Sequence, residues 1–175
     1  MVSWWSGLLP EPNIRKHLLR DEGEVIVDEV AHHWVAFVRS IFFNIVGLLL
    51  MLGTLWVDAD LGWIVFLAGL GVFAWSVYEA LEVQMDRFVV TNMRVFRVKG
   101  VFAQSLATMP LSRILDITVQ KPFLGRIFGY GHFIFESAAQ AQGLRDIRTV
   151  GRVDERDLTI QRVVQRAGLR GPRVN

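Results

Sequence analysis

The chain has 175 residues, a mean hydropathy of +0.35 and a formal net charge of +2. It contains no cysteine, which excludes disulfides, thiolate catalysis and cysteine-ligated zinc or iron–sulfur sites. The small net charge conceals a division along the chain. Residues 1–39 carry four basic against six acidic side chains, whereas residues 79–175 carry fifteen against nine. The C-terminal part therefore favours an anionic partner.

Residues 1–39 form the first predicted segment. Residues 1–12 contain no Lys or Arg and only a broken apolar stretch, so they do not resemble a cleavable signal peptide. Residues 24–30 are expected to add a strand. Trp4 and Trp5 are expected to enter the membrane interface, to pack on a partner subunit or to belong to a loose terminus.

Two uncharged apolar runs follow, residues 40–57 and 61–78, each 18 residues long and separated only by residues 58–60. As helices they would each be about 27 Å long, close to the roughly 30 Å hydrocarbon thickness of a bilayer. Burial in a soluble core is the alternative, but a chain of this size can hardly enclose two helices that are apolar on every face. We therefore predict a transmembrane hairpin over residues 40–78.

The distribution of basic residues predicts the orientation of this hairpin. Four Lys or Arg precede the first run, fifteen follow the second, and the tip has none. Basic residues accumulate on the cytoplasmic side of membrane proteins, and the tip residues Asp58 and Asp60 would be costly to keep in lipid. The predicted location is the inner cell membrane, multi-pass, with both termini cytoplasmic.

Side chains of the hairpin have two predicted structural roles. Small or polar residues fall on one face of each helix and are expected to form the seam between the helices, through close backbone approach and side-chain hydrogen bonds. These residues are Ser40, Asn44, Gly47, Thr54, Gly62, Gly69 and Ser76. Aromatic residues near the ends of the runs are expected to anchor in the interface. With Trp4 and Trp5, they are Trp34, Trp56, Trp63 and Tyr78.

After Tyr78 the pattern changes to short alternating runs with turn residues, which is typical of a half-buried antiparallel sheet. In residues 114–121, Leu115, Ile117 and Val119 are expected to face the core. An amphipathic helix follows, with Asp154 as its N-cap and Gly168 just beyond its end. A basic tail over residues 169–175 ends the chain. The expected strands are residues 86–91, 95–99, 101–109, 114–121, 132–136 and 144–149.

Three sequence stretches carry a resemblance to a known family: FVVTNMRVFRVKGVF at 88–102, MPLSRILDITVQKPFLGRIFGYG at 109–131 and FESA at 135–138. Over roughly residues 22–168 the chain resembles the bacterial pleckstrin-homology-like (PH-like) membrane proteins related to YdbS. The resemblance implies a membrane helical hairpin followed by a cytoplasmic all-β PH-like domain at 79–168. That domain would be a partly open barrel with a C-terminal capping helix. Met93 stands where Arg is usual in this family, which argues against phosphoinositide binding at that turn.

Two groups of residues are candidates for binding a partner or lipid. Residues 121–130 interleave large apolar side chains with two basic ones, and the candidates there are Lys121, Phe123, Arg126 and Phe128. Either the apolar side chains plug the mouth of the barrel, or the segment docks on the membrane surface or a neighbouring subunit. Arg94, Arg97 and Lys99 are expected to form a basic stripe on one strand. This stripe would be either a solvated strand face or a contact for an anionic partner.

We expect no enzymatic activity, metal or cofactor. The four histidines are scattered at positions 17, 32, 33 and 132, and no nucleophile elbow, Walker loop or dinucleotide motif occurs. The expected role is a membrane-anchored binding module, an accessory or scaffold subunit of a larger membrane complex. The alternative is a sensor of anionic lipid head groups, and a small transporter or pore is disfavoured because the membrane helices are uncharged. Expected partners are membrane lipids and another integral membrane protein but not nucleic acid, and a homo-oligomer remains open.

Overall fold

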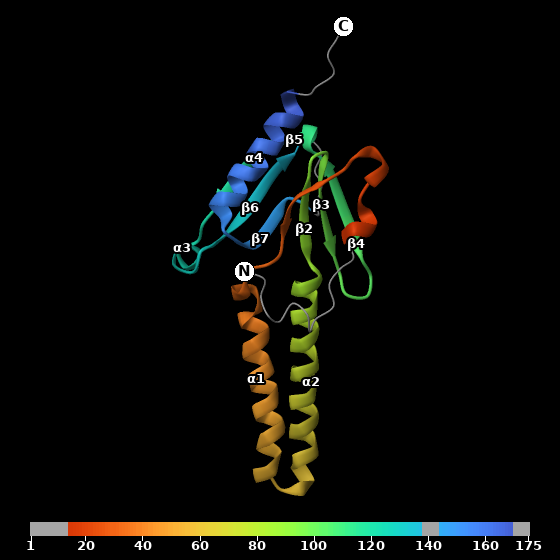
Figure 1. Cartoon of the computed structure of the whole chain (residues 1–175). Coiled ribbons are helices and arrows are strands. Elements are labelled where there is room, and N and C mark those ends of the chain that lie inside the picture. The colour runs from red at the N-terminus through yellow and green to blue at the C-terminus, as the bar shows by residue number, and fades with distance from the viewer. Residues whose placement is uncertain (1–13, 138–143, 170–175) are drawn as a thin grey trace.

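The computed structural model describes residues 14–137 and 144–169. It consists of a long helical hairpin and, at one end of it, a head made of β-strands and one long helix (Figure 1). Trp4, Trp5 and most of the basic tail lie outside the described residues.

The hairpin is formed by α1, Val38–Gly53, and α2, Ala59–Met85, which run antiparallel (Figure 1). Single 3-10 turns, η3 (Trp34–Phe37) and η4 (Thr54–Trp56), flank α1. With 27 residues, α2 is about 40 Å long. It continues past its predicted end at residue 78 into the acidic residues Glu79 and Glu82.

Glycines allow the two helices to approach closely. A Cβ atom at Gly47 would lie 2.8 Å from the backbone nitrogen of Phe73 and 3.0 Å from the carbonyl oxygen of Gly69. A Cβ atom at Gly69 would lie 2.9 Å from the carbonyl oxygen of Gly47. These distances are shorter than ordinary van der Waals contact, so the backbones meet only because both positions lack a side chain.

The polar seam residues make their hydrogen bonds within their own helices. Asn44 Nδ2 donates to the carbonyl of Ser40 at 3.0 Å, Thr54 Oγ1 to that of Met51 at 2.7 Å, and Ser76 Oγ to that of Phe73 at 2.8 Å. Ser40, Gly62 and Ser76 are buried. Among the described residues, backbone approach rather than the expected side-chain hydrogen bonds between helices makes the seam.

The head contains two antiparallel sheets. The first has the order β1-β2-β3-β4 and the second β5-β6-β7. Their bounds are β1 Ile26–Val30, β2 Arg87–Thr91, β3 Arg94–Lys99, β4 Ser105–Pro110, β5 Ile114–Gln120, β6 Tyr130–Ser137 and β7 Asp146–Gly151. The short helix α3, Phe123–Phe128, joins β5 to β6, and α4, Val153–Leu169, ends the described chain. The 3-10 turns η1 (Ile14–His17) and η2 (Arg20–Glu22) precede β1, and η5 (Leu111–Arg113) joins the sheets.

The all-β head with a C-terminal helix is confirmed, but the sheets do not close into a barrel. Outside the named strands, a single bridge in the described residues, between His32 and Val150, connects the two sheets on one side. On the other side, β4 and β5 are linked by η5, and each is the last strand of its sheet.

Two apolar clusters stabilise the head. In the main core, Val90 and Val95 of the first sheet meet Phe133 and Ile147 of the second, with Ile160 of α4. On the opposite face of the first sheet, a smaller cluster packs against η1; its buried members are Ile14, Val89, Phe96 and Val98. Strands β2 and β3 are therefore buried on both faces, which explains why they read as continuous rather than alternating apolar runs.

Two local expectations are wrong. Leu115 is 70% exposed, because a bulge between Ile114 and Asp116 inserts one extra residue into β5 and turns its side chain out of the core. Helix α4 begins at Val153 and includes Gly168, so Asp154 lies in its first turn and neither residue is a cap.

Candidate functional site

The basic residues of β3 do not form the predicted stripe. Arg94 shares a strand face with Phe96 of the outer cluster, whereas Arg97 and Lys99 share the opposite face with Val95 of the main core. Each is paired with an acid of the same chain: Arg94 with Glu24 at 2.9 Å, Arg97 with Asp86 at 2.6 Å and Lys99 with Glu82 at 3.4 Å. These positive charges therefore stabilise the fold itself.

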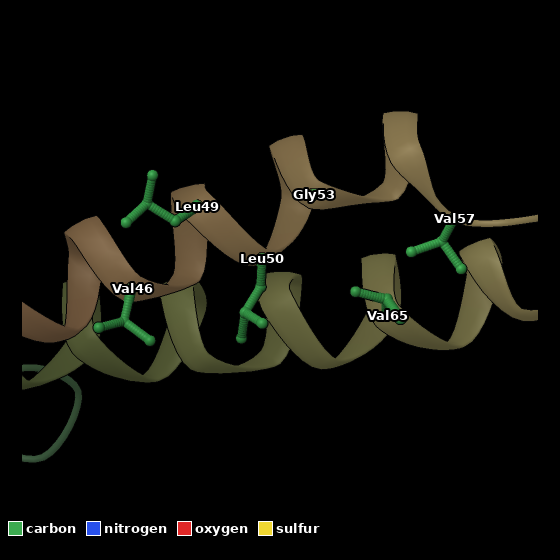
Figure 2. A pocket seen from close by; sticks show the side chains of 6 residues that line it. All are labelled: Val46, Leu49, Leu50, Gly53, Val57 and Val65. Atoms are coloured by element: carbon green, nitrogen blue, oxygen red, sulfur yellow. The ribbon is translucent and has the colours of Figure 1, made fainter.

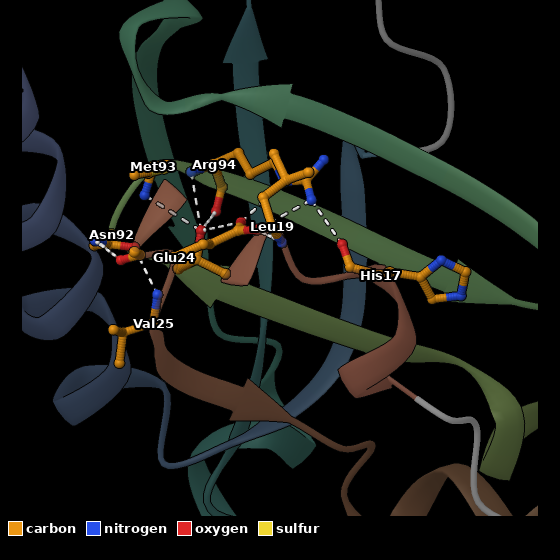
Figure 3. A network of polar contacts seen from close by, with 9 residues as sticks. His17, Leu19, Glu24, Val25, Asn92, Met93 and Arg94 are labelled. Carbon is orange, nitrogen blue, oxygen red and sulfur yellow. Dashed lines mark hydrogen bonds and ion pairs between the residues drawn. The ribbon is translucent and has the colours of Figure 1, made fainter. Parts of the chain in front are cut away.

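Glu24 is the centre of the first of these networks (Figure 3). Its fully buried carboxylate accepts hydrogen bonds from Arg94 Nε at 2.9 Å, Thr91 Oγ1 at 2.8 Å and the backbone nitrogen of Leu19 at 2.7 Å. Burial alone would raise the pKa of Glu24, but these hydrogen bonds outweigh it and lower the pKa. Because Arg94 Nη2 also donates to the carbonyl of His17 at 2.7 Å, the network ties the segment before β1 to the β2–β3 turn.

Replacing Arg94 with Gln is expected to loosen that segment by about 2 kcal/mol, the scale of a hydrogen bond to a charged group. Hydrogen exchange at the Leu19 amide and protease cleavage within residues 14–25 should both become faster. Arg113→Gln is the matched control, because Arg113 is exposed and makes no ion pair within the described residues. Equal exchange rates in the two variants would contradict this role of Arg94.

A second network lies where the hairpin joins the head. Asp86 directly follows α2, and its carboxylate accepts hydrogen bonds from Arg97 Nε at 2.7 Å and Arg97 Nη2 at 2.6 Å. His32, which precedes α1, places Nε2 3.0 Å from Asp86 Oδ2. Burial alone would raise the pKa of Asp86, but the hydrogen bonds from Arg97 and His32 hold it far below its usual range. Asp86 thus connects β3 to both chain segments that join the hairpin to the head, the one before α1 and the one after α2.

Further ion pairs lie at the head end of the hairpin. Arg39 Nε of α1 is 3.1 Å from Glu79 Oε1 of α2, and the Arg39 guanidinium lies 5.6 Å from the centre of the Trp75 ring. The Lys99–Glu82 pair connects α2 to β3. After Asp60 in its first turn, α2 carries no further charged residue until Glu79, eight residues before β2 begins at Arg87.

Two histidines, His33 and His132, lie where the bridge between His32 and Val150 connects the two sheets. The backbone nitrogen of His33 donates to the carbonyl of Thr149 at 2.7 Å, and the Thr149 nitrogen donates to His132 Nδ1 at 2.9 Å. Burial lowers the pKa of both rings, and Arg148 lowers that of His132 further. Both side chains therefore act as neutral packing and hydrogen-bonding groups near neutral pH.

The segment of residues 121–130, expected either to plug a barrel mouth or to dock on the membrane or a neighbouring subunit, projects from the head. Phe123 is 77% exposed, and Leu124, Ile127 and Phe128 are also exposed. The chain is folded sharply here: a Cβ atom at Gly125 would lie 2.3 Å from the carbonyl oxygen of Tyr130, and Gly129 ends α3 with a φ of +76°.

The two candidate bases of this segment differ in their surroundings. Lys121 pairs with Asp154 of α4. Arg126 is exposed on α3 and makes no ion pair within the described residues.

The predicted aromatic anchors lie in two places. Trp56 and Trp63, 82% and 61% exposed, lie near the tip of the hairpin. At the head end, Trp34 makes an edge-to-face contact with Phe128 of α3, and Tyr78 stacks on Phe102 of the β3–β4 loop.

A shallow apolar hollow lies between the helices near the hairpin tip. Figure 2 shows the residues that line it: Val46, Leu49, Leu50, Gly53, Val57 and Val65. No ionisable or hydrogen-bonding side chain is among them, so the hollow offers only an apolar surface. Of the described residues, no group of three His, Asp or Glu is arranged to hold a metal ion.

Sequence reasoning named Arg94 and Arg97 but missed their partners Glu24, Asp86 and His32. A usable signal was present, because Arg94 and Arg97 alternate with apolar residues of a strand that is expected to be buried, and a partly buried arginine usually pairs with an acid. The identity of that acid was beyond the pattern, since Glu24 lies 70 residues from Arg94.

Comparison with known families gives one match. The model of the bacterial PH domain family matches residues 34–167, which include the hairpin as well as most of the head. No curated protein and no solved structure matches the chain significantly. The match covers well over half of the chain and confirms the resemblance drawn from the three sequence stretches. The chain belongs to the bacterial PH domain family.

Proposed function

We propose that the hairpin crosses the cytoplasmic membrane and leaves both termini and the head on the cytoplasmic side. Two helical stretches, Trp34–Trp56 and Asp60–Met85, are long and apolar enough to cross a membrane by length and composition. Only 11% and 17% of their most apolar parts are buried inside the protein, unlike the core helix of a soluble domain. The acidic tip and the basic residues of the head support this orientation.

In this proposal the chain is an accessory or scaffold subunit whose PH-like head binds another membrane protein. The observation that carries it is the short, ion-paired junction between hairpin and head. Only Asp86 separates α2 from β2. Its contacts with Arg97 and His32 fix both chain segments that join the hairpin to the head. A head fixed in this way presents the same surface at the same height above the membrane, as a scaffold requires.

The outer edge of β4 is the proposed contact surface. This strand ends its sheet, and its backbone groups on that side pair with no other strand of the described chain. Leu106 on it is 45% exposed. An unpaired sheet edge beside an exposed apolar side chain can accept an extended segment of a partner by strand addition.

Affinity purification of the full chain in mild detergent, followed by mass spectrometry, tests this function. A membrane protein recovered in constant ratio with the wild type should be lost with Leu106→Lys, because a charge on an edge strand opposes strand addition. Leu158→Lys is the matched control, because Leu158 is exposed on α4. Recovery of the chain alone, or a partner that survives Leu106→Lys, would contradict the proposal.

Sensing of anionic head groups is the weaker alternative. Arg94, Arg97, Lys99 and Lys121 all pair with acids of the chain, which leaves Arg126 as the candidate base without such a partner in the described part. In lipid nanodiscs, a sensor would show a change in head environment that depends on anionic lipid and weakens with salt. Indifference to both would remove this alternative.

A further inference from the structure

Two exposed apolar projections extend from the side of the head that faces the hairpin. One is α3, with Phe123 77% exposed, and the other is the β3–β4 loop, with Phe102 88% exposed. Figure 1 shows α3 on one side of the hairpin and the β3–β4 loop on the other, both reaching toward its head end. Several large apolar side chains exposed together on one short helix, here Phe123, Leu124 and Ile127, indicate a surface that is covered by something else.

Both projections lie at the same level along the hairpin axis as its head end. Phe128 of α3 makes an edge-to-face contact with Trp34, with ring centres 5.7 Å apart, and Phe102 stacks on Tyr78 at 6.0 Å. Tyr78 directly precedes Glu79, whose pair with Arg39 cannot lie in hydrocarbon. In a membrane-crossing hairpin, the Arg39–Glu79 pair therefore lies among the head groups, and the aromatic tips lie at the same level.

The charges at α3 favour an anionic surface over a cationic or neutral one. Residues 121–131 contain two basic and no acidic side chains. Arg126 is exposed on the same short helix as the apolar side chains, as in segments that lie in the interface of a bilayer.

We infer that α3 and the β3–β4 loop insert their apolar side chains into the head-group region of the cytoplasmic leaflet, one on each side of the hairpin. Together with the hairpin they attach the head at three places and fix its tilt. The inference rests on the membrane crossing proposed above, and it assigns the lipid surface, rather than a protein partner, to these two projections.

Single cysteines carrying an environment-sensitive fluorophore test the inference in the full chain, because the natural sequence contains no cysteine. The chain is reconstituted in lipid nanodiscs with labels at Phe102→Cys or Phe123→Cys. Leu115→Cys is the matched control: it is 70% exposed and lies at the end of β5 opposite to α3. Labels at 102 and 123 should be quenched several-fold more by lipids with a shallow spin label, and less by aqueous iodide, than the label at 115.

Iodide accessibility at 102 and 123 equal to that at 115 would overturn the inference. So would labels that are exposed in nanodiscs but shielded in native membranes, because a protein partner would then cover the projections. A further label at Leu49→Cys reports on the hairpin itself, since Leu49 is 61% exposed on α1. If lipids labelled at mid-depth do not quench the label at 49, the proposed membrane crossing is wrong. If they do quench it, but the labels at 102 and 123 remain accessible to aqueous iodide, only the present inference is wrong.

Discussion

Replacing Asp86 with Asn is expected to destabilise the protein by about 3–5 kcal/mol, the cost of removing one partner from a buried ion pair. The variant leaves the Arg97 guanidinium in a partly buried site without its carboxylate, since the Arg97 side chain is only 16% exposed. His32 loses the same partner. Because Asp86 joins α2 to β2, the loss should loosen the attachment of the head to the hairpin as well as the head itself.

Thermal unfolding in detergent micelles measures this effect, with Asp116→Asn as the control, because Asp116 is exposed and bonds only the adjacent Ile117 amide. A double-mutant cycle with Arg97→Gln should give a clear coupling energy between positions 86 and 97. Additive effects of the two substitutions would contradict the network.

The same network predicts how stability depends on pH. The pKa of Asp86 is lowered in the folded protein, so the unfolded state binds more protons as the solution is acidified. The stabilisation is fully present above the unfolded pKa of about 3.9 and is lost as the pH falls below it. The difference in stability between wild type and Asp86→Asn should therefore shrink as the pH falls below about 4. Glu24 contributes with the same sign in both proteins and cancels in the difference.

The sequence predicted those features that depend on local pattern. The hairpin was visible because continuous apolarity over 18 residues has few explanations, and most strands appeared within a few residues of their bounds. The bulge that exposes Leu115 has no local signal, because it depends on which residue of β6 opposes each residue of β5.

The candidate site was less accessible because its geometry depends on distant partners. A basic stripe seemed to follow from the spacing of Arg94, Arg97 and Lys99, yet an odd spacing of three places Arg94 and Arg97 on opposite faces of a strand. Whether the apolar residues of α3 fill the core or face outward depends on the closure of the sheets, which one stretch of sequence does not encode. The contacts of Phe128 with Trp34 and of Phe102 with Tyr78 likewise join segments far apart in the chain.

Gly69→Val is expected to destabilise the hairpin by about 3 kcal/mol, at the upper end of the usual cost of overpacking. A Cβ atom at this position would lie 2.9 Å from both the carbonyl oxygen of Gly47 and the backbone nitrogen of Met51. Because these neighbours are backbone atoms of α1, no change of rotamer relieves the clash and the helices must separate. Gly47→Val should act in the same way, since its nearest neighbours are backbone atoms of Phe73 and Gly69.

Gly71→Val is the control for this prediction, because it makes the same substitution two residues away on α2, where a Cβ atom meets nothing within 4 Å. Both variants exchange glycine for valine, so they share the change in helix propensity and differ only in the contact with α1. Spin labels on cysteines at Leu49 and Leu67, both exposed, should move apart in Gly69→Val and keep their distance in Gly71→Val. If both variants lose equal stability, the cost of placing valine in a helix would explain the result. The contact between Gly47 and Gly69 would then not be the origin of the seam. If only Gly69→Val separates the helices, the close contact between Gly47 and Gly69 is the origin of the seam.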